Sequence, residues 1–369
     1  MALQSNTQVD DAGAPGFAGQ RNAVLRNQLT STNQVFLNAF ILEHWGFHLC
    51  AERMYVESLK ETRRSMRSLR YMTVDGMEPG LGGTPGLYSP VRPVVGRTLD
   101  EVFKLERHHA EQSLGVLSTV IAAPEAAKES TLLDFFRQAA RGQGEYVAWL
   151  TAQSDSFHEM GETVYRETQG AALQDGELKS FLQKVEELQA RDRDFPEGTA
   201  GGGDRVDSVV LQRINDLLGV EIMSAERTFV DAFLFDRCGD QSLADRIIVD
   251  ALASMRRAQR LTEHILALGE APAPGAPFDI SRPAGQASQD YLDAEKHLEE
   301  AKIAIIHGAS SSANPLPSAT QSLFAGLLRQ YERRAQWLAS GGGTASNGEP
   351  SMPPGVFRAM LGRWGVPPQ

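Results

Sequence analysis

Two stretches of the sequence match each other when the chain is shifted by 193 residues. The shift lays FLNAFILEHWG (36–46) on FVDAFLFDRCG (229–239). Under this shift, or one of 188 residues later in the chain, Glu43 falls on Asp236, Arg64 on Arg257 and Trp149 on Trp337. Any two amphipathic helices share some apolar matches, but matched charges and glycines indicate an internal duplication.

The apolar residues predict helices. They recur at three- and four-residue spacing, as in Leu211, Ile214, Leu217 and Leu218. Strand-like alternation with hairpin turn signals is not sustained anywhere. The expected fold class is all-α, as two tandem four-helix bundles. The helices are predicted over residues 20–46, 49–75, 98–122 and 130–158 in the first copy, and over 208–237, 240–268, 286–308 and 317–339 in the second.

Segments rich in Pro and Gly divide the chain. Residues 79–97 and 271–287 separate the second and third helices of each copy, and a connection of that length lets the chain cross the whole bundle. The expected organisation is a disordered arm over 1–19, domain 1 over 20–192, a linker over 193–207, domain 2 over 208–339 and a flexible tail over 340–369.

Composition excludes several classes of protein. The net charge of −11 argues against non-specific nucleic-acid binding and fits a cytoplasmic protein. Two cysteines, Cys50 and Cys238, are too few for a disulfide framework. We expect no membrane span, because no apolar run is long enough, and no secretory signal.

Several segments carry a resemblance to a known family. They are Asn27-Gln28-Leu29-Thr30, Trp45-Gly46 and Tyr55-x-Glu57-Ser58 in the first copy, and Ala258-Gln259-Arg260-Leu261 and Leu268-Gly269-Glu270 in the second. In this order they resemble the helices of bacterioferritin. The resemblance covers the chain apart from the termini and the linker. It implies ferritin-like bundles, each with one long crossover, and a place in iron homeostasis.

The resemblance also implies where a di-iron centre would lie. Such a centre takes one Glu from each of two helices and a Glu-x-x-His pair from each of the other two. The matched positions in the first copy are Gln28, Glu61-x-x-Arg64 and Gln143-x-x-Tyr146, with the third-helix position near His108 or Ala110. Those in the second copy are Glu221, Ser254-x-x-Arg257, Glu295 and Tyr331-x-x-Arg334.

None of the four matched histidine positions holds a histidine. Three hold arginine, which keeps its proton and has no lone pair for iron. The departure from the family pattern implies degenerate di-iron sites, no ferroxidase activity, no catalytic residues and no resident metal.

The arginines suggest what replaced the metals. Carboxylates buried without cations would be unstable. We therefore hypothesise that Arg257 and Arg334 neutralise Glu221 and Glu295, and that Arg64 neutralises Glu61. The alternative is that these arginines extend outward into solvent.

Three further features leave alternatives open. Met255 follows the lost second-helix glutamate, where a methionine in bacterioferritins ligates haem b, so it implies either a haem site or an apolar interface residue. His44 and His48 are four residues apart and are expected to share a helical face, so they are either a two-ligand metal clamp or ordinary surface or core residues. Tail residues 355–366 are apolar and basic, and either dock on a partner or shell or fold back as a short helix.

The sequence thus favours a non-catalytic, tandem bacterioferritin-like protein that serves as a structural or assembly subunit. It would form homo-oligomers or co-assemble with another ferritin-like protein. The alternatives are an iron-storage or iron-handling cage subunit with altered metal sites, and a haem-binding module.

Overall fold

The computed structural model describes residues 16–77, 93–170, 206–275, 288–311 and 315–340, together with 87–88, 282–283, Gly355 and Arg358. It divides into two compact units, which are described separately. The linker over 193–207, apart from its last two residues, most of the tail and residues 1–15 of the predicted arm lie outside the described residues.

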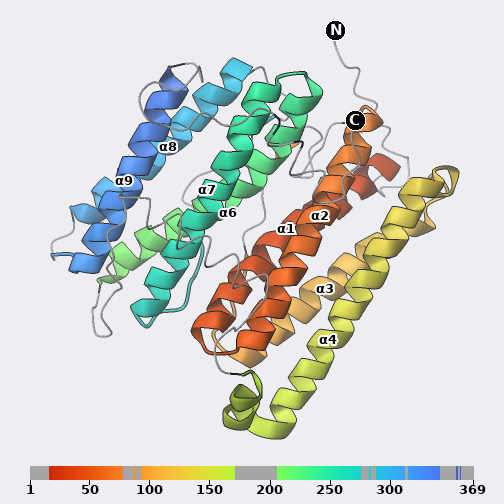
Figure 1. The fold of residues 1–369 in the computed structure, drawn as a ribbon, viewed down its shortest axis with the longest axis horizontal. Coiled ribbons are helices and arrows are strands. Elements are labelled where there is room, and N and C mark those ends of the chain that lie inside the picture. Colours follow the sequence, from red (N-terminus) through yellow and green to blue (C-terminus); the bar gives the residue numbers. More distant parts are fainter. Residues whose placement is uncertain are drawn as a thin grey trace. The chain divides into compact units, whose positions relative to one another are not determined.

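The first unit is a four-helix bundle, here called bundle 1. Its helices are α1 (Phe17–His44), α2 (His48–Val74), α3 (Leu99–Ala122) and α4 (Ser130–Thr168), with a short 3-10 helix η1 (Ala126–Lys128) before α4. Figure 1 shows α1 beside α2 and α3 beside α4. The helix α1 begins at Phe17, so the predicted arm is shorter than expected, and α4 runs on to Thr168 rather than ending near residue 158.

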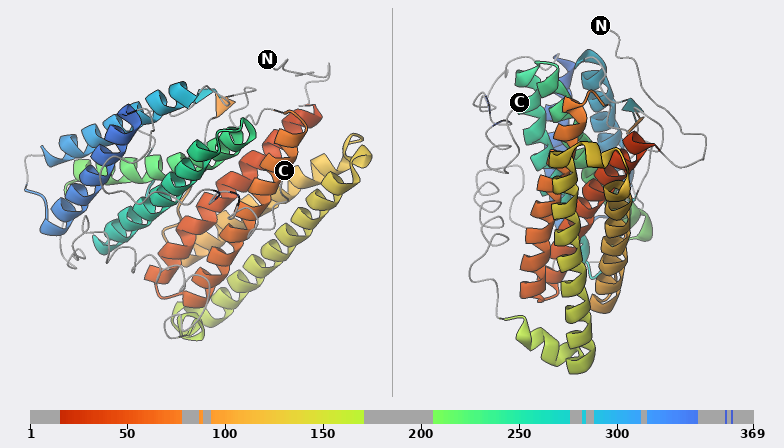
Figure 2. Two further views of the ribbon diagram at one scale, coloured as in Figure 1. Left: turned by 45° about the horizontal axis from the view of Figure 1, so that its top comes forward. Right: turned by 90° about the vertical axis from the view of Figure 1, so that its right-hand side faces the viewer.

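The second unit, bundle 2, has the same order of helices. They are α6 (Ser208–Arg237), α7 (Gln241–Ala267), α8 (Ser288–Ser310) and α9 (Ser318–Ala339), and the two views of Figure 2 show them again. The predicted all-α class with two ferritin-like four-helix bundles is confirmed. Among the described residues the only strands are β1 (Leu87–Tyr88) and β2 (Arg282–Pro283), which both belong to the first unit and pair antiparallel.

The long crossover of each bundle is fastened to that bundle's first helix. In bundle 1 the amide side chain of Gln34 donates to the carbonyl oxygen of Val94 and accepts from its N–H, both at 2.7 Å. In bundle 2 the side-chain oxygen of Asn215 accepts from the N–H of Ala273 at 2.7 Å, and its carbonyl oxygen accepts from the N–H of Gly275 at 2.8 Å.

The ends of α1 and α6 close in the same way. Gly46 and Gly239 have φ of 82° and 86°, a left-handed conformation that glycine adopts without a Cβ clash. The following N–H groups return to the helix, from Phe47 to Leu42 at 2.8 Å and from Asp240 to Phe235 at 2.9 Å. These are the positions that the 193-residue shift matches.

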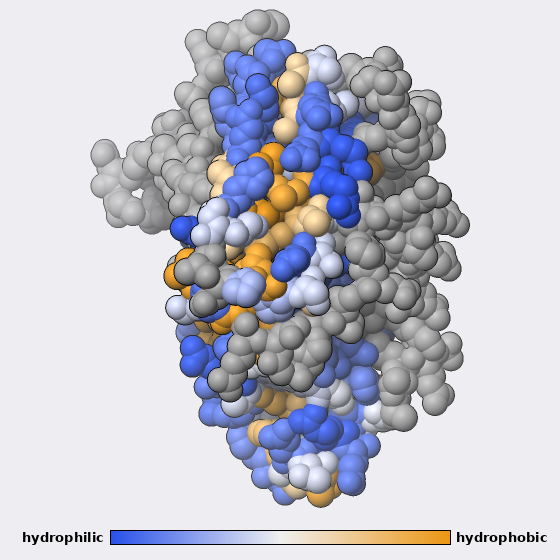
Figure 3. Space-filling model, turned by 90° about the vertical axis from the view of Figure 1, so that its left-hand side faces the viewer, coloured by the Kyte–Doolittle hydropathy of each residue, from blue (hydrophilic) through white to orange (hydrophobic). Residues whose placement is uncertain are grey.

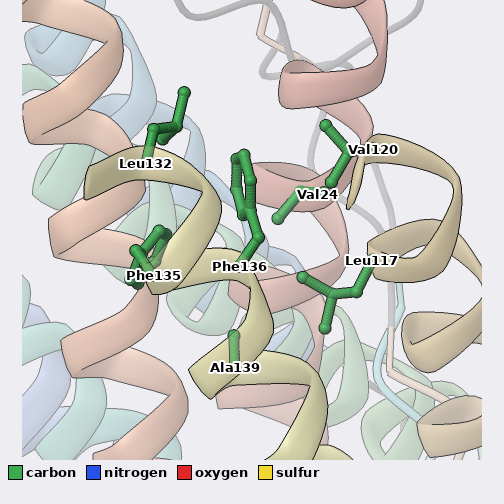
Figure 4. Close-up of a cluster of buried hydrophobic side chains, with 7 residues drawn as sticks. All are labelled: Val24, Leu117, Val120, Leu132, Phe135, Phe136 and Ala139. Atoms are coloured by element: carbon green, nitrogen blue, oxygen red, sulfur yellow. The ribbon is translucent and has the colours of Figure 1, made fainter. Parts of the chain in front are cut away.

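An apolar cluster fills bundle 1 where α3 turns into α4. Figure 4 shows side chains from α1, α3 and α4 meeting there, namely Val24, Leu117, Val120, Leu132, Phe135, Phe136 and Ala139. In bundle 2, Val220 and Met223 pack with Leu298. On the face of bundle 2 that carries α8 and α9, hydrophilic residues flank a narrow apolar strip (Figure 3). No helix in the described part of the chain is long and apolar enough to cross a membrane.

Candidate functional site

Each bundle encloses charged and polar side chains that its helices turn inward. In bundle 2, ion pairs link eight of the buried charged groups into one network: Glu221 and Arg227 on α6, Asp250 and Arg257 on α7, Glu295, Glu299 and Lys302 on α8, and Arg334 on α9.

Both ion pairs expected in bundle 2 are present. Arg257 Nη2 lies 3.0 Å from Glu221 Oε2, and Arg334 Nη2 lies 2.7 Å from Glu295 Oε2. All four side chains are buried, so these arginines point into the core and not into solvent.

Lys302 adds a fully buried ammonium group to this core. Its Nζ lies 3.1 Å from Glu221 Oε1 and 2.9 Å from Glu299 Oε1. Arg227 forms a further ion pair with Glu295. Each of the three glutamates therefore has at least one cationic partner.

Arg334 joins one more carboxylate, Asp250, to the network and also approaches Glu299. Its Nη1 is 3.5 Å from Asp250 Oδ2 and its Nε is 3.5 Å from Glu299 Oε1. Four cations thus face four carboxylates; the cations are Arg227, Arg257, Lys302 and Arg334. A fifth cation, Arg246, lies at the edge of the network, 3.6 Å from Asp250. The formal charges within the core cancel, which offsets the desolvation of buried ions.

The pKa values reflect this pairing. Burial alone would raise the pKa of Glu221, but the charges of Arg257 and Lys302 outweigh it and lower the pKa to about 2. Glu221 is therefore ionised at neutral pH. Ser254 Oγ accepts a hydrogen bond from Arg257 Nη2 at 2.9 Å, and the ring of Tyr331 lies 5.5 Å from the Arg257 guanidinium carbon.

The residues of bundle 2 do not fit a di-iron centre. Such a centre needs carboxylate oxygens and imidazole nitrogens with free lone pairs. In bundle 2 guanidinium and ammonium groups already bind the carboxylates, and Arg257 and Arg334 stand at the matched histidine positions.

Bundle 1 has fewer cations in its core. Glu57, which is fully buried, lies 3.2 Å from Arg64 Nη1 and 3.1 Å from Lys60 Nζ. The Arg64 guanidinium also pairs with Glu61, as expected, and Nη1 lies 3.4 Å from Gln143 Oε1. Arg64 therefore serves both glutamates, and its side chain is more withdrawn from solvent than those of Arg53 and Lys60, which also pair with Glu57.

Glu106 on α3 differs from the other core glutamates. It is 1% exposed, and within the described chain it has no ion pair. Instead Asn38 Nδ2 donates to its Oε1 at 2.7 Å, and the Tyr146 hydroxyl donates to its Oε2 at 3.3 Å. Among the described residues, only hydrogen bonds from uncharged side chains therefore hold this carboxyl group.

The pKa values of bundle 1 move in the opposite direction from that of Glu221. Burial raises the pKa of Glu61 to about 7, although Arg64 opposes the rise. Burial raises the pKa of Glu106 to about 8, against the hydrogen bonds from Asn38 and Tyr146. Protons thus supply part of the neutralisation that arginine and lysine supply in bundle 2.

Bundle 1 matches a di-iron donor set only in part. Glu61 and Glu106 are carboxyl groups, but Gln28 is an amide that accepts a hydrogen bond from Ser68 at 2.6 Å, and Tyr146 is a phenol whose burial raises its pKa. Among the residues that the structure describes, no three His, Cys, Asp or Glu side chains gather into a metal-binding group. The imidazole donors are missing here too.

The third-helix position in bundle 1 needs a correction. The sequence placed it near His108 or Ala110, but His108 is exposed and bonds to Gln112, while Ala110 offers no polar group. Glu106, one helical turn earlier, supplies the buried carboxyl group. The long crossover precedes this helix, and the sequence does not show how its length compares with that of the family. Counting residues along the chain therefore gave the wrong position.

Sequence reasoning also missed other members of the two cores, namely Glu57, Arg227, Asp250, Glu299 and Lys302. One signal was available for α8. Glu295, Glu299 and Lys302 are spaced by four and three residues, which places them on one helical face.

The shared helical face expected for His44 and His48 is wrong, because the two residues lie on different helices. α1 ends at His44 and α2 begins at His48, whose Nδ1 lies 2.8 Å from Glu43. Met255 lies half-buried on α7. Haem binding through Met255 stays a prediction, which an absorption spectrum of the purified protein would test.

Of tail residues 355–366, the structure describes Gly355 and Arg358. The N–H of Gly355 donates to Asp245 Oδ2 on α7 at 2.7 Å, so the chain returns to bundle 2 at that point. The rest of 355–366 apart from Arg358 lies outside the described residues, and both readings of the tail stay predictions.

The geometry defines a class of protein: a four-helix bundle with one long crossover and a carboxylate-bearing polar core. A family model described as a ferritin-like domain matches residues 20–160. Bundle 1 is therefore similar to a ferritin-like domain, the family that the resemblance to bacterioferritin implied.

Curated relatives agree with this assignment. A bacterioferritin of Mycobacterium leprae is 27% identical over 154 residues, which are 42% of this chain and 92% of the relative. A bacterial ferritin of Pseudomonas aeruginosa is 28% identical over 161 residues, 42% of this chain and 98% of the relative. A bacterioferritin of Streptomyces coelicolor is 25% identical over 157 residues, 42% of this chain and 90% of the relative.

Proposed function

We propose that this chain is a non-catalytic, tandem ferritin-like protein that serves as a structural or assembly subunit in the cytoplasm. The observation that carries the proposal is the charge-balanced core of bundle 2. The four carboxylates of this network already pair with four cations, so a divalent cation placed there would have to displace Arg257, Lys302 or Arg334 from their partners.

Bundle 1 and bundle 2 would be the products of a duplication. Support comes from matched features away from the cores. The Arg53 guanidinium lies 5.8 Å from the Trp149 ring in bundle 1, and the Arg246 guanidinium lies 4.6 Å from the Trp337 ring in bundle 2. One chain with two bundles would then stand in for a two-subunit dimer of the family and assemble further with copies of itself or with another ferritin-like protein.

Iron stoichiometry tests the non-catalytic part of the proposal. The full-length protein is loaded with ferrous iron without oxygen, desalted and analysed for iron, beside a bacterioferritin that has an intact centre. We expect less than about 0.2 iron per chain, because arginine offers no lone pair. About two or more irons per chain would overturn the proposal.

The second candidate is an iron-handling subunit with an altered site in bundle 1. Glu106 favours it, because this buried carboxyl group has no cationic partner among the described residues, and Glu61 shares Arg64 with Glu57. If bundle 1 holds a divalent cation, binding of Co²⁺ should be lost in Glu106→Gln and kept in Glu295→Gln, which alters only bundle 2. Absence of Co²⁺ binding in the unmodified protein would exclude this candidate.

A further inference from the structure

The last helix of bundle 1 is broken near its end. Gly161 has φ of 74° and ψ of 161°, which no α-helix contains, and α4 resumes beyond it as far as Thr168. Residues 162–169 are here called the hook. Figure 1 shows this end of α4 turning back at the lower end of bundle 1, toward the turn between α1 and α2.

The side chains of Tyr165 and Arg166 hold the hook against the rest of bundle 1. The ring of Tyr165 lies 6.2 Å from that of Phe47 and 5.6 Å from that of Phe157. The Arg166 guanidinium lies 4.4 Å from the Phe47 ring and donates to the carbonyl oxygen of Trp45. The hook therefore covers the residues that join α1 to α2.

The closed hook also covers a thiol. Cys50 Sγ lies 3.1 Å from the Tyr165 hydroxyl, and the N–H of Cys50 donates to Gln169 Oε1 at 3.1 Å. Tyr165 gives its own proton to Gln153 at 2.7 Å, so the thiol is the donor to the phenol oxygen. Burial raises the pKa of Cys50 to about 11, so the covered thiol stays protonated.

Few buried groups hold the hook in place. Between residues 158 and 170 only Tyr165 and Gln169 are buried, and the rest are exposed. Segments with so few buried contacts open at a lower free energy than the core to which they belong. Because the helix is already interrupted at Gly161, the hook can leave without unwinding α4 before that residue.

We propose that the hook is a latch that closes this end of bundle 1 and opens as a unit about Gly161, so that the latch controls access to the Cys50 thiol and to the aromatic residues beneath it. This device does not depend on whether either bundle binds iron.

Thiol labelling of the native full-length protein tests the latch. Iodoacetamide is added and the modification of each cysteine is followed by mass spectrometry of peptides, with the exposed Cys238 as the internal standard. We expect Cys50 to react slowly, with a rate that changes little over low urea concentrations, as local opening does. A Cys50 rate with the full urea dependence of global unfolding would overturn the proposal.

Variants of the hook separate the latch from a general loss of stability. Tyr165→Ala should raise the Cys50 rate by about tenfold or more while Cys238 is unchanged. Gln169→Ala, a smaller change, should raise it less and serves if Tyr165→Ala does not fold. Glu167→Ala, at an exposed hook position, is the matched control and should leave the rate unchanged. Equal rates in all three variants and the parent would refute the latch.

Discussion

Glu106 and Glu295 occupy corresponding places on the third helices of the two bundles, but their partners differ in charge. Glu106 accepts hydrogen bonds from Asn38 on the first helix and Tyr146 on the fourth. Glu295 pairs with Arg227 on the first helix and Arg334 on the fourth. A proton neutralises the first carboxyl group and two guanidinium groups neutralise the second, so the two bundles should respond differently to pH.

The stability of bundle 1 should fall as the pH rises. The pKa of Glu106 is raised from its ordinary 4.5 to about 8 in the folded protein. Its contribution is therefore present below pH 4.5 and lost progressively up to about pH 8. Glu106→Gln keeps a neutral group there, so urea unfolding should show a gain of about 1–3 kcal/mol over the parent at pH 9 and a smaller one at pH 5.

The control for that prediction is Glu295→Gln in bundle 2. It leaves Arg227 and Arg334 short of a carboxylate, so it should destabilise bundle 2 at both pH values. A parent protein whose bundle 1 is equally stable at pH 5 and pH 9 would contradict the assignment of Glu106 as a neutral core group.

Removal of Arg334 should be the most damaging single change in the core of bundle 2. Arg334→Met leaves Asp250 and Glu299 with fewer partners and Glu295 with Arg227 alone. Breaking a buried ion pair from one side costs about 3–5 kcal/mol. Lys296→Ala removes an exposed pair with Glu300 at 3.7 Å and should cost less than about 1 kcal/mol. Thermal unfolding measures both, and equal losses would show that the core network is not what stabilises bundle 2.

Gly142 on α4 makes room for the Arg64 guanidinium. A Cβ at this position would overlap Arg64 Nη2, whereas a Cβ at Gly144 would meet nothing within 4 Å. Gly142→Ala should therefore displace Arg64 from Glu57 and Glu61 and cost about 1–3 kcal/mol. Gly144→Ala, in the same helix, should be neutral or stabilise by up to about 1 kcal/mol. Urea unfolding of the two variants checks the pair, and the reverse order would contradict the placement of Arg64.

Gly219 on α6 lets the crossover of bundle 2 approach closely. A Cβ there would overlap the backbone of Gly275, and a Cβ at Gly308 on α8 would meet nothing within 4 Å. We expect Gly219→Ala to destabilise bundle 2 by about 1–3 kcal/mol and to speed amide exchange at Ala273 and Gly275. Gly308→Ala is the control, and unchanged exchange in Gly219→Ala would mean that the crossover is not held there.

Much of the fold could be predicted from the sequence. The period of the apolar residues located the eight long helices of the described part of the chain, because a helix buries one face and that face repeats every three or four residues. Glycine marked the ends of α1 and α6 because few other residues adopt the left-handed conformation needed there. The helix predicted over 130–158 runs on to Thr168, and the break at Gly161 that forms the hook carries no strong sequence signal.

The candidate site was predictable in its residue types but not in its full membership. The missing histidines and the arginines at their positions are properties of single residues, so the sequence by itself determined that the usual nitrogen donors are absent. Helical periodicity also assigned a face to each residue. It does not say which residue of another helix lies opposite, because that depends on the rotation and axial offset of packed helices. Only the tertiary structure decided that Glu106 meets Asn38 and Tyr146, and that Lys302 meets Glu221.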